Sequence, residues 1–216
     1  MTIKLNGSTA GSVGLDAPAS TTGNADINFK LPVADGSAGQ VLKTDGSGNL
    51  SWVNLGGITE ADQFLLTSDL TVSGTATTVT GNLARSGYSF MGTNSKIGTG
   101  MSESGGVFTF PSTGKDLINT CATFKSTNQN IYAAFRSQLS VDGGSNWYYI
   151  MVNYTSIFDS GSNEVYAVAN GQALVDITDV STHKFRCSAT SNGTMYVAGH
   201  ANEAYTSIVF TRLGDT

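Results

Sequence analysis

Side chains that could act as general bases are scarce in this chain. It contains two histidines, His183 and His200, which are separated in the sequence. A serine hydrolase needs a nucleophile, a base and an orienting acid, but the many serines include no Gly-x-Ser-x-Gly turn of the kind that presents a nucleophile. His183 ends a polar segment that begins at Asp179, and we expect it on the surface. The histidines therefore do not predict a catalytic base.

Carboxylates offer a second route to catalysis. Glu60 with Asp62, and Asp176 with Asp179, are spaced closely enough to be considered as glycosidase pairs. Such enzymes need two acids that face each other across a cleft, and spacing along the chain does not show this. Four turn residues also carry oxygen ligands that calcium accepts: Asp142, Asn146, Asp159 and Asn163. Turn formation explains those residues without a metal, so we expect no catalytic residue, no metal and no cofactor.

Binding chemistry is better represented, because aromatic residues gather between Trp147 and Tyr154. Aromatic faces stack on sugar rings and often anchor binding. The alternative is that this run is a core strand or a subunit interface. Turns at 142–146, 159–163 and 191–193 are candidate recognition loops, because loops carry binding on a rigid scaffold. The candidate ligand-binding residues are Asp142, Asn146, Trp147, Tyr148, Asp159, Asn163 and Asn192.

Composition limits the function further. Only 12% of the 216 residues are charged, the net charge is −5, and the basic residues are scattered. A nucleic-acid surface is therefore not expected. No apolar run approaches the roughly 18 residues of a membrane span, and no signal sequence follows Met1. We expect synthesis in a cytoplasm and no membrane insertion.

The two cysteines, Cys121 and Cys187, each lie in an alternating strand pattern. Buried free thiols are the ordinary interpretation of such cysteines. A disulfide between neighbouring strands is the alternative.

Residues 85–216 show the alternation of half-buried strands. In the segment 131–141 one face is apolar, while Arg136 and Gln138 lie on the other. In 147–154 both faces are apolar, which predicts a strand that is central or packed against a partner subunit. Pro111–Gly114 and Asn192-Gly193 predict hairpins. About eight to ten such strands fit a jelly-roll sandwich.

Residues 1–56 form a separate region of short β segments, and residues 57–84 connect it to the head. The first region has too few large apolar side chains to bury a core alone. We therefore expect three chains to intertwine there, with Phe29, Leu31 and Trp52 sharing one core. The predicted fold class is all-β, with a short intertwined N-terminal β region followed by a jelly-roll head, as a homotrimer.

The segment Gly106-Val-Phe-Thr-Phe-Pro-Ser-Thr-Gly114 resembles the start of the jelly-roll head shared by complement-type and tumour-necrosis-factor-type trimers. The family usually has tyrosine where this chain has Asp116, which leaves the strand register there open. The terminal Phe210-Thr-Arg-Leu-Gly214 is similar to the family's last strand, which usually lies at the trimer centre. The resemblance implies a homotrimeric binding head and not an enzyme. The expected trimer core is Phe29, Leu31, Trp52, Tyr149 and Phe210.

The N-terminal region resembles that of structural proteins from phages of marine cyanobacteria. Matching strings include Leu15-Asp-Ala-Pro18, Phe29-Lys-Leu-Pro32 and the run from Leu42 to Trp52. The resemblance implies a tail fibre or appendage on the virion surface, assembled in the host cytoplasm. Its N-terminal region would join other virion proteins, and its head would contact the host surface, including surface polysaccharide. The alternative is a capsid-decoration or tail-cementing trimer with a purely structural role.

Overall fold

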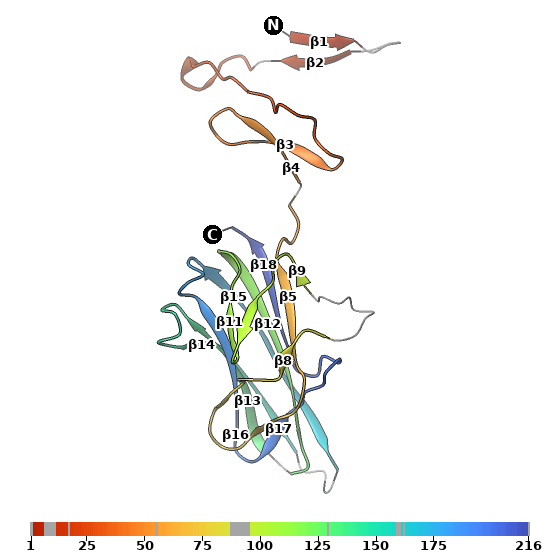
Figure 1. The fold of residues 1–216 in the computed structure, drawn as a ribbon, viewed down its shortest axis with the longest axis vertical. Coiled ribbons are helices and arrows are strands. Elements are labelled where there is room, and N and C mark those ends of the chain that lie inside the picture. Colours follow the sequence, from red (N-terminus) through yellow and green to blue (C-terminus); the bar gives the residue numbers. More distant parts are fainter. Residues whose placement is uncertain are drawn as a thin grey trace. The chain divides into compact units, whose positions relative to one another are not determined.

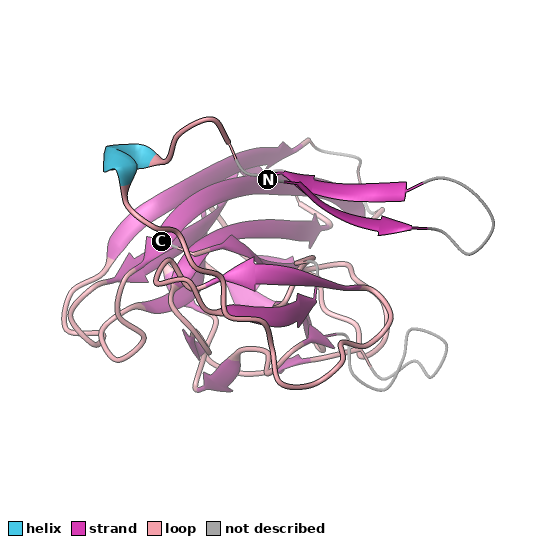
Figure 2. Ribbon diagram, turned by 90° about the horizontal axis from the view of Figure 1, so that it is seen from above, coloured by secondary structure: helices cyan, strands magenta, loops and turns pink. Residues whose placement is uncertain are grey.

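The computed structural model describes residues 2–6, 12–16, 18–54, 56–86, 96–128, 130–158, 161 and 163–215. The chain divides into two compact units, Met1–Gly57 and Ile58–Thr216, and the second is the head (Figure 1). Nearly all regular structure is strand, and the described part contains one short 3-10 helix, η1 (Thr22–Asn24) (Figure 2). No helix in that part of the chain is long and apolar enough to cross a membrane. The prediction of an all-β chain is confirmed.

The first unit consists of two hairpins with little core. Its strands are β1 (Thr2–Asn6), β2 (Ser12–Asp16), β3 (Gln40–Thr44) and β4 (Leu50–Asn54), paired β1 with β2 and β3 with β4. None of its described side chains is buried, and Phe29 and Leu31 are 63% and 68% exposed. Trp52 lies against Gly36, and its Nε1 donates a hydrogen bond to the Ala34 carbonyl at 3.0 Å. A single chain therefore leaves the apolar side chains of this unit largely uncovered.

One sheet of the head has six antiparallel strands. Their order is β10 (Ser102–Ser104), β11 (Val107–Thr109), β16 (Lys184–Ser191), β13 (Asn130–Ser140) and β14 (Tyr148–Ile157), with β7 (Thr77–Thr78) also paired to β16. The β10–β11 turn requires Gly106, whose φ is +82° and where a Cβ would lie 1.9 Å from the Val79 carbonyl oxygen. The strand β14 is at the edge of its sheet, so the predicted central position is wrong. Its packing against a partner subunit stays a prediction.

The other sheet has eight strands. Along its main path the order is β6 (Leu70–Val72), β17 (Met195–Val197), β12 (Gly114–Ser126), β18 (Ser207–Gly214), β5 (Ala61–Leu66) and β8 (Leu83–Ala84). The strand β15 (Val165–Ile177) pairs with β12, and β9 (Lys96–Ile97) pairs with β5. Since β5, β6, β7 and β8 all fall within 57–84, the predicted connector is part of the head.

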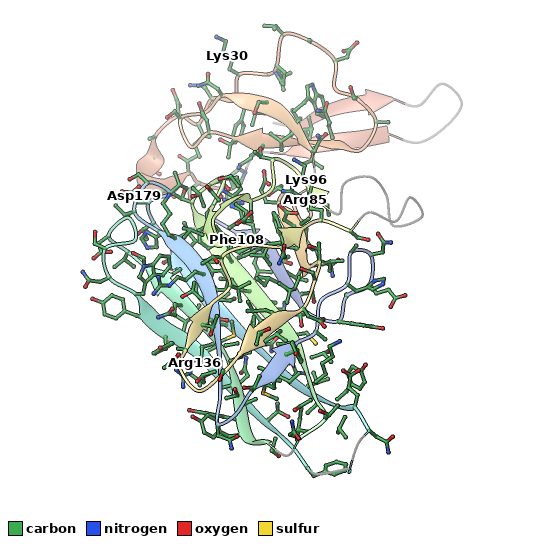
Figure 3. All side chains as sticks on the ribbon, turned by 60° about the horizontal axis from the view of Figure 1, so that its bottom comes forward. Lys30, Arg85, Lys96, Phe108, Arg136 and Asp179 are labelled. Atoms are coloured by element: carbon green, nitrogen blue, oxygen red, sulfur yellow. The ribbon has the colours of Figure 1, made fainter. Side chains whose placement is uncertain are left out.

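Phenylalanine rings fill the centre of the core between the two sheets. The ring of Phe108 lies 5.0 Å from that of Phe64 and 5.1 Å from that of Phe210, centroid to centroid (Figure 3). Phe185 is 5.3 Å from Phe210 in an edge-on arrangement, which aromatic pairs favour. Phe210 is only 2% exposed. The prediction that its side chain forms the trimer core is therefore wrong, because the ring is enclosed within its own chain.

Two predicted hairpins are crossings between the sheets. Asn192-Gly193 joins β16 of one sheet to β17 of the other, and Pro111–Gly114 likewise joins β11 to β12. In both cases the flanking strands do not pair. A turn sequence reverses the chain locally, but the apolar faces decide whether the next strand pairs beside the first or packs opposite it.

Both cysteines are free thiols on strands of different sheets. Cys187 is buried, and burial raises the pKa of its thiol to about 12. Cys121 is half-buried, and the same cause raises its pKa. The prediction of free thiols is confirmed, and the alternative disulfide is wrong.

Candidate binding face

The outward face of the six-stranded sheet carries guanidinium and aromatic side chains. Arg136 and Gln138 stand two residues apart on β13, so they project from the same face. Gln138 lies opposite Tyr149 on β14 and opposite Arg186 on β16. Arg136, labelled in Figure 3, lies opposite Val152 on β14. The arginine–aromatic patch comprises Arg136, Gln138, Trp147, Tyr149, Val152 and Arg186.

Each arginine of the patch stacks on a ring. The Arg186 Cζ lies 4.2 Å from the centroid of the Trp147 ring, and the Arg136 Cζ lies 5.5 Å from that of Tyr149. Both distances are within the range of cation–π attraction. Arg186 Nε also donates a hydrogen bond to Gln138 Oε1 at 2.9 Å. These contacts hold the guanidinium groups in place without using most of their N–H donors.

The patch has no carboxylate partner in the part of the chain that the structure describes. Among the described residues, no Asp or Glu lies within 4.0 Å of the guanidinium nitrogens of Arg136 or Arg186. The chain's other two arginines, Arg85 and Arg212, each pair with an aspartate. Partial burial lowers the pKa of Arg186, although arginine remains protonated in proteins. On a chain of net charge −5, the patch is a local positive surface that can accept an anion.

Asp142 and Asn146 build the turn between β13 and β14. Asp142 Oδ1 accepts hydrogen bonds from the Asn146 backbone N–H at 2.9 Å and from Ser140 Oγ at 2.8 Å. Its Oδ2 accepts one from Asn146 Nδ2 at 2.7 Å. These bonds, with the Asn146 backbone N–H first, lower the pKa of Asp142 to about 2. The carboxylate predicted to bind ligand is thus occupied within the turn, which leads the chain into Trp147.

The other predicted ligand residues do not gather at one place. Tyr148 is 60% exposed and begins β14 next to the patch. Asn192 lies at the opposite end of β13, where its Oδ1 accepts a hydrogen bond from the Tyr132 backbone N–H at 3.0 Å. Asn163 is exposed in the connection from β14 to β15, and Asp159 lies outside the described residues. Binding by these residues stays a prediction.

Sequence reasoning missed four members of the patch as site residues: Arg136, Gln138, Val152 and Arg186. The alternation along 131–141 already placed Arg136 and Gln138 together on the polar face. Arg186 joins them only because β16 pairs with β13, and no local pattern indicates that pairing. The sequence does contain one signal that could have indicated this site. Arg136 and Arg186 both lie in predicted strands, and neither has an acidic residue close to it in the sequence.

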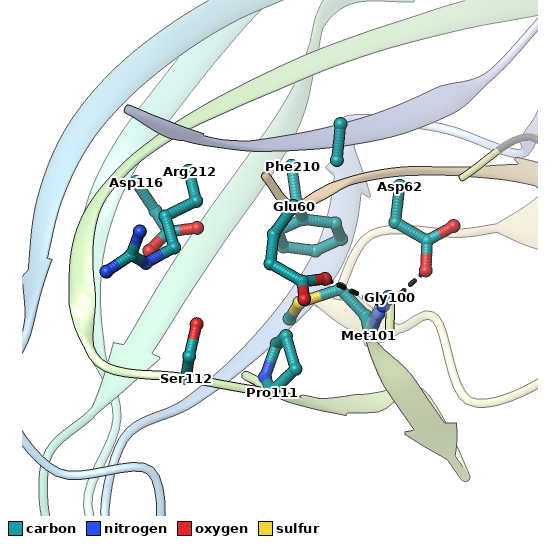
Figure 4. Close-up of a pocket in the computed structure, with 10 residues that line it drawn as sticks. Glu60, Asp62, Gly100, Met101, Pro111, Ser112, Asp116, Phe210 and Arg212 are labelled. Atoms are coloured by element: carbon teal, nitrogen blue, oxygen red, sulfur yellow. Dashed lines mark hydrogen bonds between the residues drawn. The ribbon is translucent and has the colours of Figure 1, made fainter. Parts of the chain in front are cut away.

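A second polar site is a small cavity where β5 and β12 begin and β18 ends (Figure 4). Its polar lining is Glu60, Asp62, Ser112, Asp116 and Arg212. The cavity volume of about 10 Å³ is room for about one water molecule. We call it the acidic cavity. It has no room for a sugar ring, so its carboxylates do not form the cleft of a glycosidase.

Glu60 and Asp62, which were considered from the sequence as a carboxylate pair, bind the backbone of the glycine-containing segment before β10. Glu60 accepts hydrogen bonds from the backbone N–H groups of Thr99 and Gly100 at 3.0 and 2.9 Å. Asp62 accepts one from the Met101 N–H at 2.7 Å. Gly100 has a φ of +75°, and a Cβ there would lie 2.6 Å from Asp62 Oδ2. The two carboxylates therefore have a structural role in the described chain.

Asp116 is the unpaired acid of the cavity. It is 5% exposed, and its Oδ2 and the Oγ of Ser112 have no hydrogen-bond partner among the described residues. Burial raises the pKa of Asp116 to about 6, against the opposing charge of Arg212. The pairing of β12 with β18 shifts register between Lys115 and Asp116. The irregularity lies where the resemblance left the register open.

The histidines lie in local hydrogen-bonded turns. His183 is 8% exposed, so the prediction of a surface histidine is wrong; its Nδ1 lies 2.9 Å from the Asp179 carbonyl oxygen. His200 Nδ1 accepts a hydrogen bond from the Glu203 backbone N–H at 3.1 Å. Nor do the described residues contain a group of three or more His, Cys, Asp or Glu that could hold a metal ion.

Comparison with known proteins shows similarity in fold. No family model and no curated protein matches the chain. The structure of Eiger TNF from S. frugiperda matches with a TM-score of 0.55 at 9% identity, over 72% of this chain and 93% of that one. Murine APRIL at pH 5.0 matches with a TM-score of 0.50 at 11% identity, over 71% of this chain and 98% of that one. At these identities the similarity shows the fold alone, and it confirms a TNF-like jelly roll.

Proposed function

We propose that this protein is a homotrimeric, non-enzymatic binding protein of a phage particle, a tail fibre or appendage whose head contacts the host surface. The observation that carries the proposal is the arginine–aromatic patch, where two stacked guanidinium groups have no carboxylate partner among the described residues. The TNF-like fold of the head agrees with a binding role. The phage setting rests on the sequence strings between Leu15 and Trp52.

Self-association is supported by the outward face of the eight-stranded sheet. Its side chains on β12, β15 and β18 are uncharged over a broad area: Leu117, Asn119, Cys121, Thr123, Val168, Asn170, Gln172, Leu174, Val209 and Thr211. We call this the neutral face. Charges occur only toward its two ends, as the pairs of Lys115 with Asp176 and Lys125 with Asp69. A sheet face without charges is typical of one that another protein surface covers, and we assign it to copies of this chain.

The substitution Leu174→Glu tests the neutral face. Leu174 is 64% exposed, so a glutamate there should leave the monomer folded. If three copies meet on this face, burying the new carboxylate should weaken assembly by at least about tenfold. Native mass spectrometry and light scattering would report trimer for the unmodified chain and a shift toward monomer for the variant.

Tyr154→Glu is the matched control, because Tyr154 is 65% exposed on the other sheet. It should leave the trimer intact. A monomeric unmodified chain would overturn the homotrimer, and a Leu174→Glu variant that remains fully trimeric would overturn the assignment of the neutral face.

The position of the protein on the particle tests its role. Antibodies against the head, imaged on intact virions by electron microscopy, should label the tail periphery. Label spread over the capsid would favour the decoration trimer instead. The observation that favours this alternative is the small volume of the acidic cavity, which has room for about one water molecule and not for a sugar.

A further inference from the structure

We infer that the arginine–aromatic patch is a binding site for an acidic saccharide. Arg136 and Arg186 would receive the carboxylate or sulfate groups of its sugars, and the rings beside them would lie against the sugar faces. The inference rests on the proposed function, because it names the ligand class of the same head. It can be tested, and rejected, independently of the proposed function.

The anion-binding part of the patch has a defined geometry. Arg136 and Arg186 are diagonal neighbours on adjacent strands, since Gln138 stands opposite Arg186 and two residues from Arg136. Side chains in such positions originate about 7–8 Å apart. The Nη groups of Arg186, and all guanidinium N–H groups of Arg136, have no hydrogen-bond acceptor among the described residues. Two planar donor forks are therefore held close together, and such forks match anionic oxygens in pairs.

The rings point to a sugar and not to a free anion. Tyr149 and Tyr154 are 53% and 65% exposed on the edge strand β14, and Val152 between them is 38% exposed. This strip lies beside Arg136, which is opposite Val152, and Gln138 separates it from Arg186 on the next strand. Aromatic faces offer flat contact area at low entropy cost, with a polar tip for hydroxyl groups. A ligand that binds both the guanidinium groups and the exposed rings must carry a negative charge on a ring with an apolar face.

Charge distribution favours a saccharide over a nucleic acid. Nucleic-acid affinity comes mainly from many phosphate contacts, whereas this patch supplies two cations on a chain of net charge −5. A polysaccharide with spaced acidic groups needs fewer cations per contact. Weak individual sites would be strengthened when three heads act on one polymer.

The experiment measures binding of the full chain to immobilised probes by biolayer interferometry. The probes are an oligogalacturonate, a sulfated galactan oligosaccharide, a maltooligosaccharide of equal length and a single-stranded oligothymidylate. We expect binding to at least one acidic saccharide, weakened by added salt, and little binding to the neutral one. Arg136→Gln with Arg186→Gln should weaken this binding by at least about tenfold.

Two variants make the test specific. Lys30→Gln with Lys43→Gln removes the same charge from exposed positions in the first unit, and it should leave binding within about twofold of the unmodified chain. Arg136→Lys with Arg186→Lys keeps the charge but removes the planar forks, and it should weaken binding several-fold. Urea unfolding of each variant verifies that the fold is retained.

Failure of the inference is separate from failure of the proposed function. No binding to either acidic saccharide, equal binding to the neutral one, tighter binding to oligothymidylate, or no effect of the double glutamine variant would each overturn it. If virion label is at the tail periphery in such a case, the host-contact role stands and only the ligand class falls. Arginine-dependent binding together with capsid-wide label would support the site and overturn the appendage role.

Discussion

The four arginines of the head fall into two pairs that differ in one respect. Arg85 stacks on Phe64 at 4.6 Å, much as Arg186 stacks on Trp147 at 4.2 Å. The ring contact is therefore common to both regions. Arg85 and Arg212, beside the acidic cavity, also have carboxylate partners, whereas Arg136 and Arg186 in the patch have none among the described residues. Arg85 holds the fold together through the buried carboxylate of Asp62. The partner of Arg212, Asp215, is 94% exposed, and Arg212 Nε also donates a hydrogen bond to the Thr113 carbonyl at 2.9 Å. A guanidinium stacked only on a ring is available to a ligand.

Burial explains why the contact of Arg85 with Asp62 is structural. The Asp62 side chain is 1% exposed, and it receives Arg85 Nε at 2.8 Å and Nη2 at 2.5 Å. A carboxylate removed from water to that extent needs a cation and hydrogen bonds. Arg85 Nη2 also donates to the Met101 carbonyl at 3.0 Å. The charge of Arg85 is thus used inside the head, between β5 and the segment before β10.

The largest difference between the two regions is expected in the loss of stability when an arginine is replaced by glutamine. Arg85→Gln leaves the Asp62 carboxylate buried without its cation. It should lower the free energy of unfolding by about 3 kcal/mol, the lower end for a broken buried pair because Arg85 keeps 28% exposure. Arg136→Gln should change it by less than about 0.5 kcal/mol. Urea unfolding at neutral pH measures both, and equal losses would contradict the division of the arginines into two classes.

Asp116, which lines the same acidic cavity as Asp62, differs from it because its Oδ2 has no hydrogen-bond partner in the described chain. Its folded pKa of about 6 lies above the ordinary 3.8. The protonated carboxyl of Asp116 therefore contributes its full stabilisation to the folded head below about pH 4. This contribution to the free energy of unfolding is lost as the pH rises through about 6. The loss is about 1–2 kcal/mol after solvent screening is allowed for.

Asp116→Asn should remove this pH dependence and increase stability at pH 7 by a similar amount. Unfolding curves at pH 4 and pH 7 for both proteins provide the measurement. Asp176→Asn serves as a control, since Asp176 is exposed and paired with Lys115. A pH dependence that persists in the Asp116→Asn variant would show that Asp116 is not its source.

The fold class and many strands could be predicted from the sequence, because alternation depends on nearest neighbours along the chain. The assignment of strands to sheets could not. Asn192-Gly193 is a strong hairpin signal, yet β16 and β17 lie in different sheets because each buries its apolar face from opposite sides of one core. Phe210 was assigned to the trimer by its place in the last strand, but the ring packs against Phe108.

The candidate site was predictable only in part, for the same reason. Trp147 was singled out for its aromatic neighbours, and it stacks on an arginine that lies 39 positions further along the chain. Asp142 was singled out as a ligand residue, but its carboxylate closes the turn. Residue type indicates the chemistry a side chain can do. Strand register decides which other side chains it meets, and that register involves contacts between distant segments.

The smallest expected effect on stability is also the sharpest test of the comparison. Val152 lies opposite Arg136 across the β13–β14 pairing, so Val152→Glu would give this arginine the carboxylate partner it lacks. A cross-strand ion pair at an exposed site should add about 0.2–1 kcal/mol relative to Val152→Gln. A double-mutant cycle with Arg136→Gln isolates that coupling. If the missing counter-charge is what makes Arg136 available to a ligand, Val152→Glu should weaken acidic-saccharide binding much more than Val152→Gln does, since both variants remove the same apolar side chain but only the glutamate adds a charge. Unchanged binding in the glutamate variant would show that the missing counter-charge is not what makes this patch a binding face.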